Sequence, residues 1–90
     1  MDRTLFIVAN VIVTPGAQAE LDALPLPIQG RIYNVFRRLE KWPGVSGVKA
    51  LRGNLAGNSR IRTGDYRVVF RIVGNTVIVW KTGYRGDVYD

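Results

Sequence analysis

One short stretch, residues 59–73, fixes most of what this chain can fold into. Its sequence, SRIRTGDYRVVFRIV, holds two runs in which apolar and charged residues alternate, separated by Thr63-Gly64-Asp65. Alternation places successive side chains on opposite faces of a strand, and glycine supplies the left-handed backbone that a tight turn requires. The stretch therefore predicts a β-hairpin over Ser59–Val73.

The two faces of this predicted hairpin differ in charge. One face is apolar, and the other carries four arginines, which are Arg60, Arg62, Arg67 and Arg71. Guanidinium groups bind planar oxyanions through paired donors and stay charged at any working pH. The pattern indicates either a phosphate-binding surface or an ordinary solvated sheet face, and the stretch alone leaves both open.

The charge of the whole chain favours an anionic partner. The 90 residues contain 13 lysines and arginines against 7 acidic residues, which gives a net charge of +6 and a pI near 10.3. Nucleic acid, an acidic protein or an anionic membrane are the partner classes that such a domain suits. A chain of this length builds one modest core, so residues 1–90 are predicted to form a single domain.

The absence of two residue types narrows the chemistry. The chain has no cysteine and no histidine, which excludes disulfides, thiolate catalysis and histidine acid–base catalysis. We expect no transition-metal site and no cofactor. Any catalysis must use tyrosine, lysine, arginine or a carboxylate.

The N-terminal region has some features of a signal peptide, with Arg3, an apolar run over Leu5–Val13 and an Ala17-Gln18-Ala19 site. The run is rich in β-branched residues and Asp2 offsets Arg3, so we predict a largely buried strand over Leu5–Val13 in place of an export signal. The run is too short to span a membrane as a helix. No membrane association is expected.

Two helices are predicted next. Thr14-Pro15 provides an N-cap and a proline in the first helical position, and this helix is expected to reach about Leu24. A second helix is predicted over about Ile28–Trp42, with apolar residues at helical spacing and a basic outer face that suits solvent. Pro43-Gly44 ends it.

The remaining elements complete an α+β domain. Val45–Gly57 reads as a glycine-rich connector, Gly74-Asn75 as a tight turn and Thr76–Thr82 as a strand, in which Trp80 is expected to lie in the core. The element order is β-α-α-β-β-β. Two N-terminal helices are expected to pack on one face of a mainly antiparallel sheet, which leaves the other face for the arginines.

With these elements in order, the chain resembles the RelE/ParE superfamily of bacterial type II toxins. Four motifs carry the resemblance: Val13-Thr14-Pro15-Gly16-Ala17, the segment Val48–Gly53, the segment Arg60–Phe70, and Arg85-Gly86-Asp87-Val88-Tyr89. Together they extend over residues 10–90. The resemblance implies the RelE-like α+β fold and a cytoplasmic bacterial protein that an antitoxin protein neutralises in a hetero-oligomer.

Two activities occur in this superfamily. RelE-like members are endonucleases that cut mRNA on the ribosome, and ParE-like members inhibit DNA gyrase. The catalytic residues that the resemblance implies, carried over by position, are Arg60, Arg62, Arg67, Arg85 and Tyr89. ParE-like chains usually lack the final tyrosine, so Tyr89 favours the nuclease branch, with DNA gyrase as the alternative target. A non-catalytic member that binds only its antitoxin or nucleic acid is a further alternative.

The chain departs from RelE in two ways that affect the proton transfers. It has Arg60 and Arg62 where RelE has lysines, and Tyr84 where many relatives have histidine. Arginine is not deprotonated in proteins, so the base is Tyr89, Tyr84, the substrate phosphate or a ribosomal group. The expected chemistry is metal-independent attack of the RNA 2′-OH on the adjacent phosphate. Further residues predicted to contact nucleic acid are Lys49, Arg52, Arg71, Lys81 and Tyr84.

Overall fold

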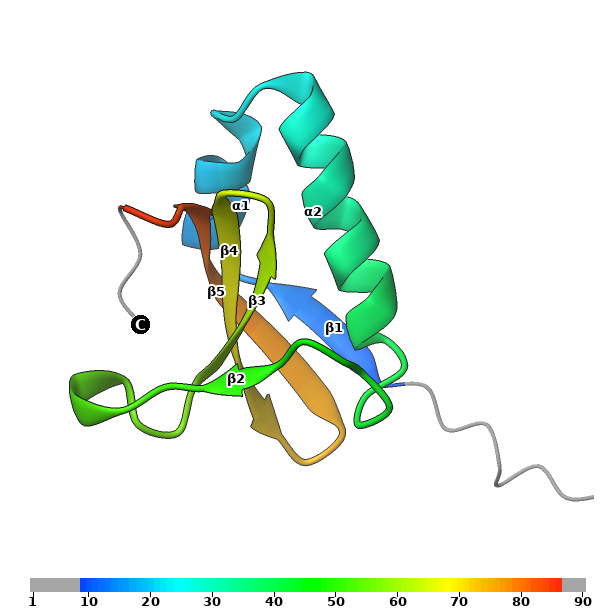
Figure 1. Ribbon diagram of the computed structural model, residues 1–90. Helices are drawn as coiled ribbons and strands as arrows, with labels where there is room; N and C mark the ends of the chain where they lie inside the picture. Colours follow the sequence, from blue (N-terminus) through cyan, green and yellow to red (C-terminus); the bar gives the residue numbers. More distant parts are fainter. Residues whose placement is uncertain (1–8, 87–90) are drawn as a thin grey trace, which may run out of the picture.

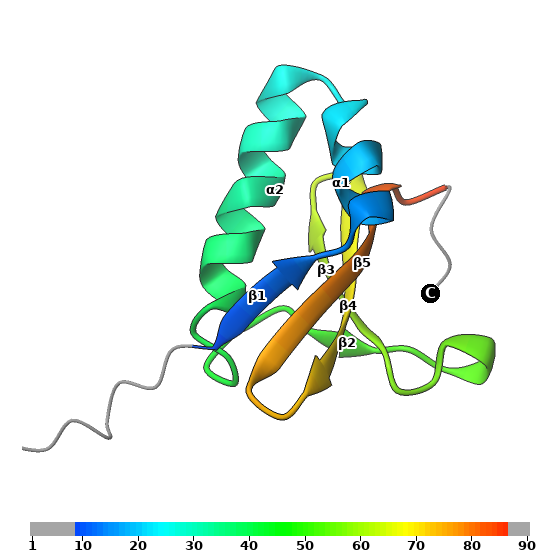
Figure 2. The same ribbon diagram turned by 180° about the vertical axis from the view of Figure 1, so that it is seen from behind.

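A five-stranded sheet with two helices on one side forms the molecule (Figures 1 and 2), as seen in a computed structural model that describes residues 9–86. The elements in chain order are β1 (Asn10–Val13), α1 (Pro15–Asp22), α2 (Leu26–Leu39), β2 (Lys49–Ala50), the 3₁₀ helix η1 (Gly53–Leu55), β3 (Ser59–Thr63), β4 (Tyr66–Val73) and β5 (Thr76–Tyr84). The strand order is β1-β5-β4-β3-β2, and every pair is antiparallel except β1 with β5. The predicted α+β class and element order are confirmed.

Helix α1 begins where the sequence predicts. The Thr14 hydroxyl oxygen accepts a hydrogen bond from the Ala17 backbone N–H at 3.2 Å, and Pro15 occupies the first helical position, where its missing N–H costs nothing. Ala17 and Leu21 are fully buried against the sheet. The Thr82 hydroxyl donates to the Ala17 carbonyl at 3.0 Å, which joins α1 to β5.

Helix α2 supplies most of the helical side of the core. It runs over Leu26–Leu39, so it begins slightly earlier and ends three residues earlier than the sequence predicts. Its buried residues are Ile32, Val35, Phe36 and Leu39, and its basic side is exposed. Within residues 9–86, no helix is both long enough and apolar enough to cross a membrane.

Strand β1 corrects the prediction of a largely buried first strand. The predicted segment Leu5–Val13 extends into residues 1–8, which lie outside the described residues. The described part pairs in parallel with β5, from Asn10 opposite Thr76 to Val13 opposite Val79. This part lies at the edge of the sheet and only one of its faces packs on the core, so Ile12 is 53% exposed.

The predicted hairpin is confirmed. Strands β3 and β4 are joined at Gly64-Asp65, where Gly64 has a φ of +60°, a conformation that side chains with a Cβ rarely adopt. Strand β5 extends to Tyr84, two residues beyond the predicted end, and its register shifts opposite Val69 and Phe70. The shift is a β-bulge, which places an extra residue on β5.

The predicted connector, residues 45–57, contains two short elements that the sequence pattern did not reveal. Strand β2 adds to the edge of β3, and η1 follows it. Between them Leu51 is buried against Val69 on the sheet face that points away from the helices, with Leu55 and Trp80 beside it. The open face of the sheet therefore has a small apolar cluster of its own.

Candidate functional site

Four arginines converge on the open face of the hairpin and at the end of β5. In the β3–β4 register Arg62 stands opposite Arg67, and Arg60 stands opposite Val69. Arg85 directly follows β5, and its backbone N–H donates to the Asp65 carbonyl at 2.8 Å, which fastens this end of the chain to the hairpin turn. These four residues, Arg60, Arg62, Arg67 and Arg85, form the arginine group. The structure thus brings together all of the predicted catalytic arginines.

Arg67 lies at the electrostatic centre of this group. Burial of its guanidinium is the main cause that lowers the pKa of Arg67, and the charges of Arg62, Arg60 and Arg85 lower it further. Burial also lowers the pKa of Arg60, with a smaller effect from Arg62. Arg60 and Arg67 are only 8% and 6% exposed, whereas Arg62 and Arg85 are exposed. Two guanidiniums therefore form the floor of the group and two stand at its surface.

This arrangement suits a bound phosphate better than it suits proton transfer. Several guanidiniums that share one small area offer converging donors to an oxyanion. Arginine cannot act as a base, because it stays protonated in proteins. Of the tyrosines predicted near the site, Tyr84 is 46% exposed and its ring meets Tyr66 edge-on at 5.9 Å. Tyr89 lies outside the described residues.

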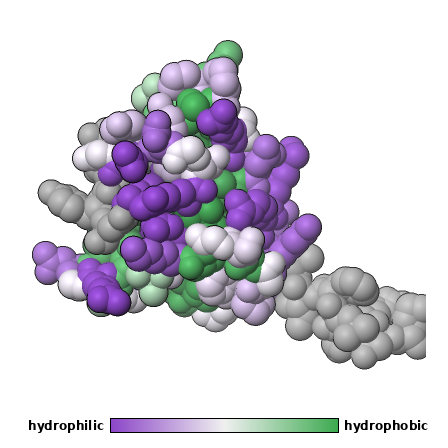
Figure 3. All heavy atoms as spheres, in the orientation of Figure 1, coloured by the Kyte–Doolittle hydropathy of each residue, from purple (hydrophilic) through white to green (hydrophobic). Residues whose placement is uncertain are grey.

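Two of the residues predicted to contact nucleic acid, Lys49 and Arg52, lie on or just after strand β2. Lys49 on β2 stands opposite Arg60 and is exposed, so it extends the arginine group toward the edge of the sheet. Arg52, which follows β2, is also exposed. A hollow of about 280 Å³ is lined by residues 49–52. In the view of Figure 3, hydrophilic side chains gather over the hairpin and again along α2.

Lys81 has a different setting. Its Nζ lies 2.8 Å from a carboxylate oxygen of Glu20 on α1, and the other oxygen of Glu20 accepts from the Thr82 backbone N–H at 3.1 Å. Both side chains of the pair are about one-third exposed. The structure gives Lys81 a role in fastening β5 to α1, and its predicted contact with nucleic acid stays a prediction.

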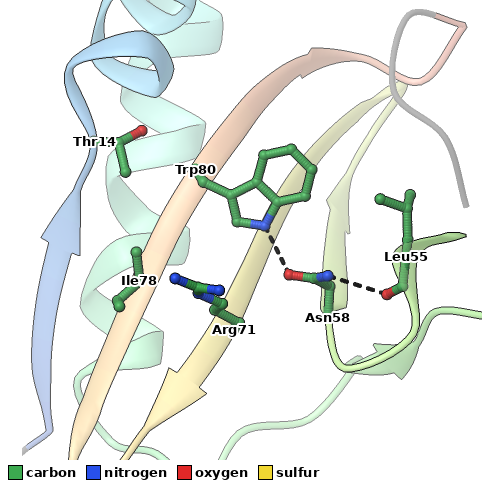
Figure 4. A pocket seen from close by; sticks show the side chains of 6 residues that line it. All are labelled: Thr14, Leu55, Asn58, Arg71, Ile78 and Trp80. Atoms are coloured by element: carbon green, nitrogen blue, oxygen red, sulfur yellow. Dashed lines mark hydrogen bonds between the residues drawn. The ribbon is translucent and has the colours of Figure 1, made fainter.

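A second hollow on the open face includes Arg71 and a residue that the sequence placed wrongly, Trp80 (Figure 4). Its volume is about 340 Å³, and its lining consists of Thr14, Leu55, Asn58, Arg71, Ile78 and Trp80. Trp80 does share its face with Ile78, as the alternation predicts, but Val77 and Val79 are the residues that face the helices. Because both alternating sets of β5 are apolar, the pattern could not identify the core side.

Asn58 is the residue of this hollow that sequence analysis missed, because no motif marks it. The Trp80 indole N–H donates to the Asn58 side-chain oxygen at 2.8 Å, and the Asn58 amide donates to the Leu55 carbonyl at 3.1 Å. Figure 4 shows the chain of hydrogen bonds that runs from the indole through Asn58 to Leu55. These bonds fix the orientation of the ring on the open face.

Comparison with known proteins gives a single family. Residues 11–89 match the family model described as the ParE toxin of the type II toxin–antitoxin system, parDE. No curated protein matches the chain.

Solved structures of toxins have the same fold. The toxin–antitoxin complex RelBE2 from Mycobacterium tuberculosis contains a chain with 27% identity and a TM-score of 0.77, covering 88% of this chain and 100% of that one. The RelB–RelE complex from Methanococcus jannaschii matches at 22% identity, with a TM-score of 0.71 and coverage of 88% and 95%. The isolated RelE toxin of E. coli matches at 18% identity, with a TM-score of 0.70 and coverage of 84% and 83%. The M. jannaschii and E. coli structures are less than 25% identical to this chain, so these two matches support only the fold.

Proposed function

Since the chain belongs to the ParE toxin family, within the RelE/ParE superfamily of type II toxins, we propose that it is an endoribonuclease that cleaves mRNA on the ribosome and so arrests translation. The observation that carries this proposal is the arginine group, in which burial and then the neighbouring positive charges lower the pKa of Arg67. Like charges held this close repel one another. A bound phosphate relieves that repulsion, and it does so most when it carries extra negative charge.

The proposed chemistry uses the RNA itself as the nucleophile. The 2′-oxygen attacks the adjacent phosphorus, the bond to the 5′-oxygen breaks, and the products are a 2′,3′-cyclic phosphate and a 5′-OH. The phosphorane that forms on the way carries more charge than the substrate does. Donors already aimed at such charge supply the largest share of many enzymes' rate enhancement. In this proposal the buried Arg60 and Arg67 donate to the phosphorane from below, and the exposed Arg62 and Arg85 donate from the surface.

The proton transfers need groups beyond the arginines. A base must take the proton from the 2′-OH, and the candidates are Tyr89, Tyr84, the substrate phosphate and a group of the ribosome. Tyr84 is exposed one residue before Arg85. Reliance on a ribosomal group fits a site whose central side chains cannot accept a proton. Arg85 is proposed to stabilise the leaving 5′-oxygen by donating a hydrogen bond to it while remaining charged, and water or a group of the ribosome supplies the proton, with no metal ion taking part.

A cognate antitoxin is the proposed protein partner. Toxin–antitoxin complexes are among the solved relatives, which supports a partner of this kind for the present chain. The net charge of +6 suits an acidic antitoxin that covers the arginine group. The complex of the two proteins would then hold the toxin inactive.

The proposal is tested by inducing the chain alone in a bacterial host. Pulse labelling follows protein and DNA synthesis, and primer extension maps new 5′ ends on an abundant message. We expect rapid loss of protein synthesis with new 5′ ends inside codons. An Arg67→Gln variant should lose this effect, and Arg37→Gln on the exposed side of α2 should keep it as a matched control.

The second candidate is inhibition of DNA gyrase by protein binding, which the match to the ParE family model favours. In this case translation continues after induction while DNA breaks and the damage response is induced. The arginine group would then be a protein-binding surface. Such an outcome in the same host contradicts the nuclease proposal.

A further inference from the structure

We propose that the hollow at Trp80 is a base-binding subsite, in which one unstacked base of the RNA lies on the indole ring and Arg71 binds a neighbouring phosphate. This inference rests on the proposed function, because it takes single-stranded RNA as the ligand. It adds a place on the toxin where a base is held away from the scissile phosphate. Nothing in the family match assigns such a place.

The exposure and the fixed orientation of Trp80 suit it to bind a base. Trp80 is only half-buried, and its ring lies on the open face of the sheet. Its single polar group is already bonded to Asn58, which is itself bonded to Leu55. The ring is thus held in one orientation before any ligand arrives. A fixed aromatic face binds any base by stacking and loses little freedom in doing so.

The side chains that line the hollow with Trp80 combine apolar groups with one cation. Ile78 and Leu55 offer apolar contact beside the indole, and Arg71 is exposed at the same hollow. Arg71 makes no ion pair within residues 9–86. An aromatic ring with a cation beside it is the combination that single-stranded nucleic acid requires, because bases stack while phosphates pair with charge.

The hollow at Trp80 lies on the same face of the sheet as the arginine group. Arg67, Val69 and Arg71 share the open face of β4, since they are spaced by two residues on one strand. Val69 stands between Arg60 on β3 and Lys81 on β5 in the sheet register, and Trp80 packs on Val69. From Arg67 to Arg71 is about 13 Å along the strand. A short extended RNA segment can therefore contact both places on a single face.

The test measures binding without cleavage. The chain has two tryptophans, Trp42 and Trp80, so a Trp42→Phe variant makes Trp80 the only source of indole fluorescence. The probe is a short 2′-O-methyl oligoadenylate, which lacks the attacking hydroxyl, and the comparison is an abasic oligomer with the same number of phosphates. We expect saturable quenching of Trp80 by the oligoadenylate and little by the abasic oligomer.

Two further variants separate the base contact from the phosphate contact. Trp80→Leu should weaken oligoadenylate binding by about tenfold or more, measured by retention of labelled oligomer. Arg71→Gln, at an exposed position that leaves the fold intact, should weaken binding to both oligomers and lower the salt dependence by about one counterion. Arg37→Gln on α2 is the control for loss of one exposed charge and should change neither the quenching nor the discrimination between oligomers.

The outcomes keep this inference distinct from the proposed function. Quenching by oligoadenylate in a chain that never cleaves mRNA supports the subsite and discards the nuclease. Ribosome-dependent cleavage with no quenching of Trp80 keeps the nuclease and overturns the subsite. Quenching by an acidic peptide and not by oligoadenylate also overturns it, since the hollow would then bind protein.

Discussion

Arg62 of β3 is the direct cross-strand partner of Arg67 of β4, so two side chains of like charge face the same side of the hairpin. Like charges in this relation destabilise a sheet. Arg67 is also nearly buried, which adds to the cost of its charge. A bound anion would favour the charged form of both guanidiniums and so offset this cost.

Replacing Arg62 with glutamine should raise the stability of the protein and lower its activity. The change removes the like-charge pair, so the free energy of unfolding should rise by about 0.2–1 kcal/mol. The rate of mRNA cleavage on ribosomes should fall by about 10²–10³, because one donor to the phosphorane is lost. Urea unfolding and a ribosome cleavage assay measure the two effects. Arg37→Gln should change neither the free energy of unfolding nor the cleavage rate. An Arg62→Gln variant that is less stable and fully active would contradict the proposal that Arg62 costs stability and serves catalysis.

The pH dependence of cleavage should identify the base. Burial lowers the pKa of both Arg60 and Arg67, yet guanidiniums remain protonated over the range of an assay, so neither adds an inflection. A tyrosine base becomes more effective as pH rises toward about 10. We expect Tyr89→Phe to lower the rate and to remove this alkaline rise, while Tyr84→Phe keeps it. If Tyr89→Phe is fully active and Tyr89→Ala is inactive, Tyr89 stacks on the RNA and takes no proton.

Glu20 should stabilise the end of β5. Its carboxylate binds both the Lys81 ammonium and the Thr82 backbone N–H. Glu20→Ala should therefore lower the free energy of unfolding by about 1–2 kcal/mol, a range that allows for partial exposure of the pair. Lys81→Met should lower the free energy of unfolding by a smaller amount, because Glu20 keeps its hydrogen bond to the Thr82 backbone N–H. Asp22→Asn, on the exposed side of the same helix, is the control; an equal loss there would remove any special role for Glu20.

Replacing either of two glycines with alanine should change the stability of the protein, in opposite directions at the two positions. Gly30 lies inside α2 with open space where a Cβ would stand, so Gly30→Ala should stabilise the protein by about 0.5–1 kcal/mol. Gly64 has a φ of +60° in the hairpin turn, and its added Cβ would lie 3.1 Å from the Arg31 guanidinium. Gly64→Ala should destabilise the protein by about 1–2 kcal/mol. Thermal unfolding of the two variants tests both signs, and a stabilised Gly64→Ala would contradict the turn geometry.

The hairpin, the start of α1 and the grouping of the arginines could be predicted from the sequence. Each of these depends on local rules: alternation sets the faces of β3 and β4, and Thr14-Pro15 sets the start of α1. The catalytic roles of these residues stay predictions. The register of β3 and β4 brings Arg60, Arg62 and Arg67 together, and the backbone bond to Asp65 adds Arg85 to them.

What the sequence could not supply depends on contacts between distant segments. Strand β2 is two residues long and forms only because β3 offers an edge. Both alternating sets of residues in TVIVW are apolar, so the pattern does not show which face of β5 meets the helices, and it predicts Trp80 in the core. The burial of Arg60 and Arg67 was also hidden, since alternation tells which way a side chain points and not how much lies above it.

Strand β1 finds its partner 66 positions later in the chain, where Asn10 pairs with Thr76. During synthesis the first strand must therefore wait for the last described strand before the sheet can close. The end of β5 also brings Arg85 to the hairpin turn, so the arginine group is assembled at the same late stage. Non-local pairings of this kind form slowly. A nascent copy of this toxin therefore has no complete arginine group until the chain up to Arg85 has left the ribosome.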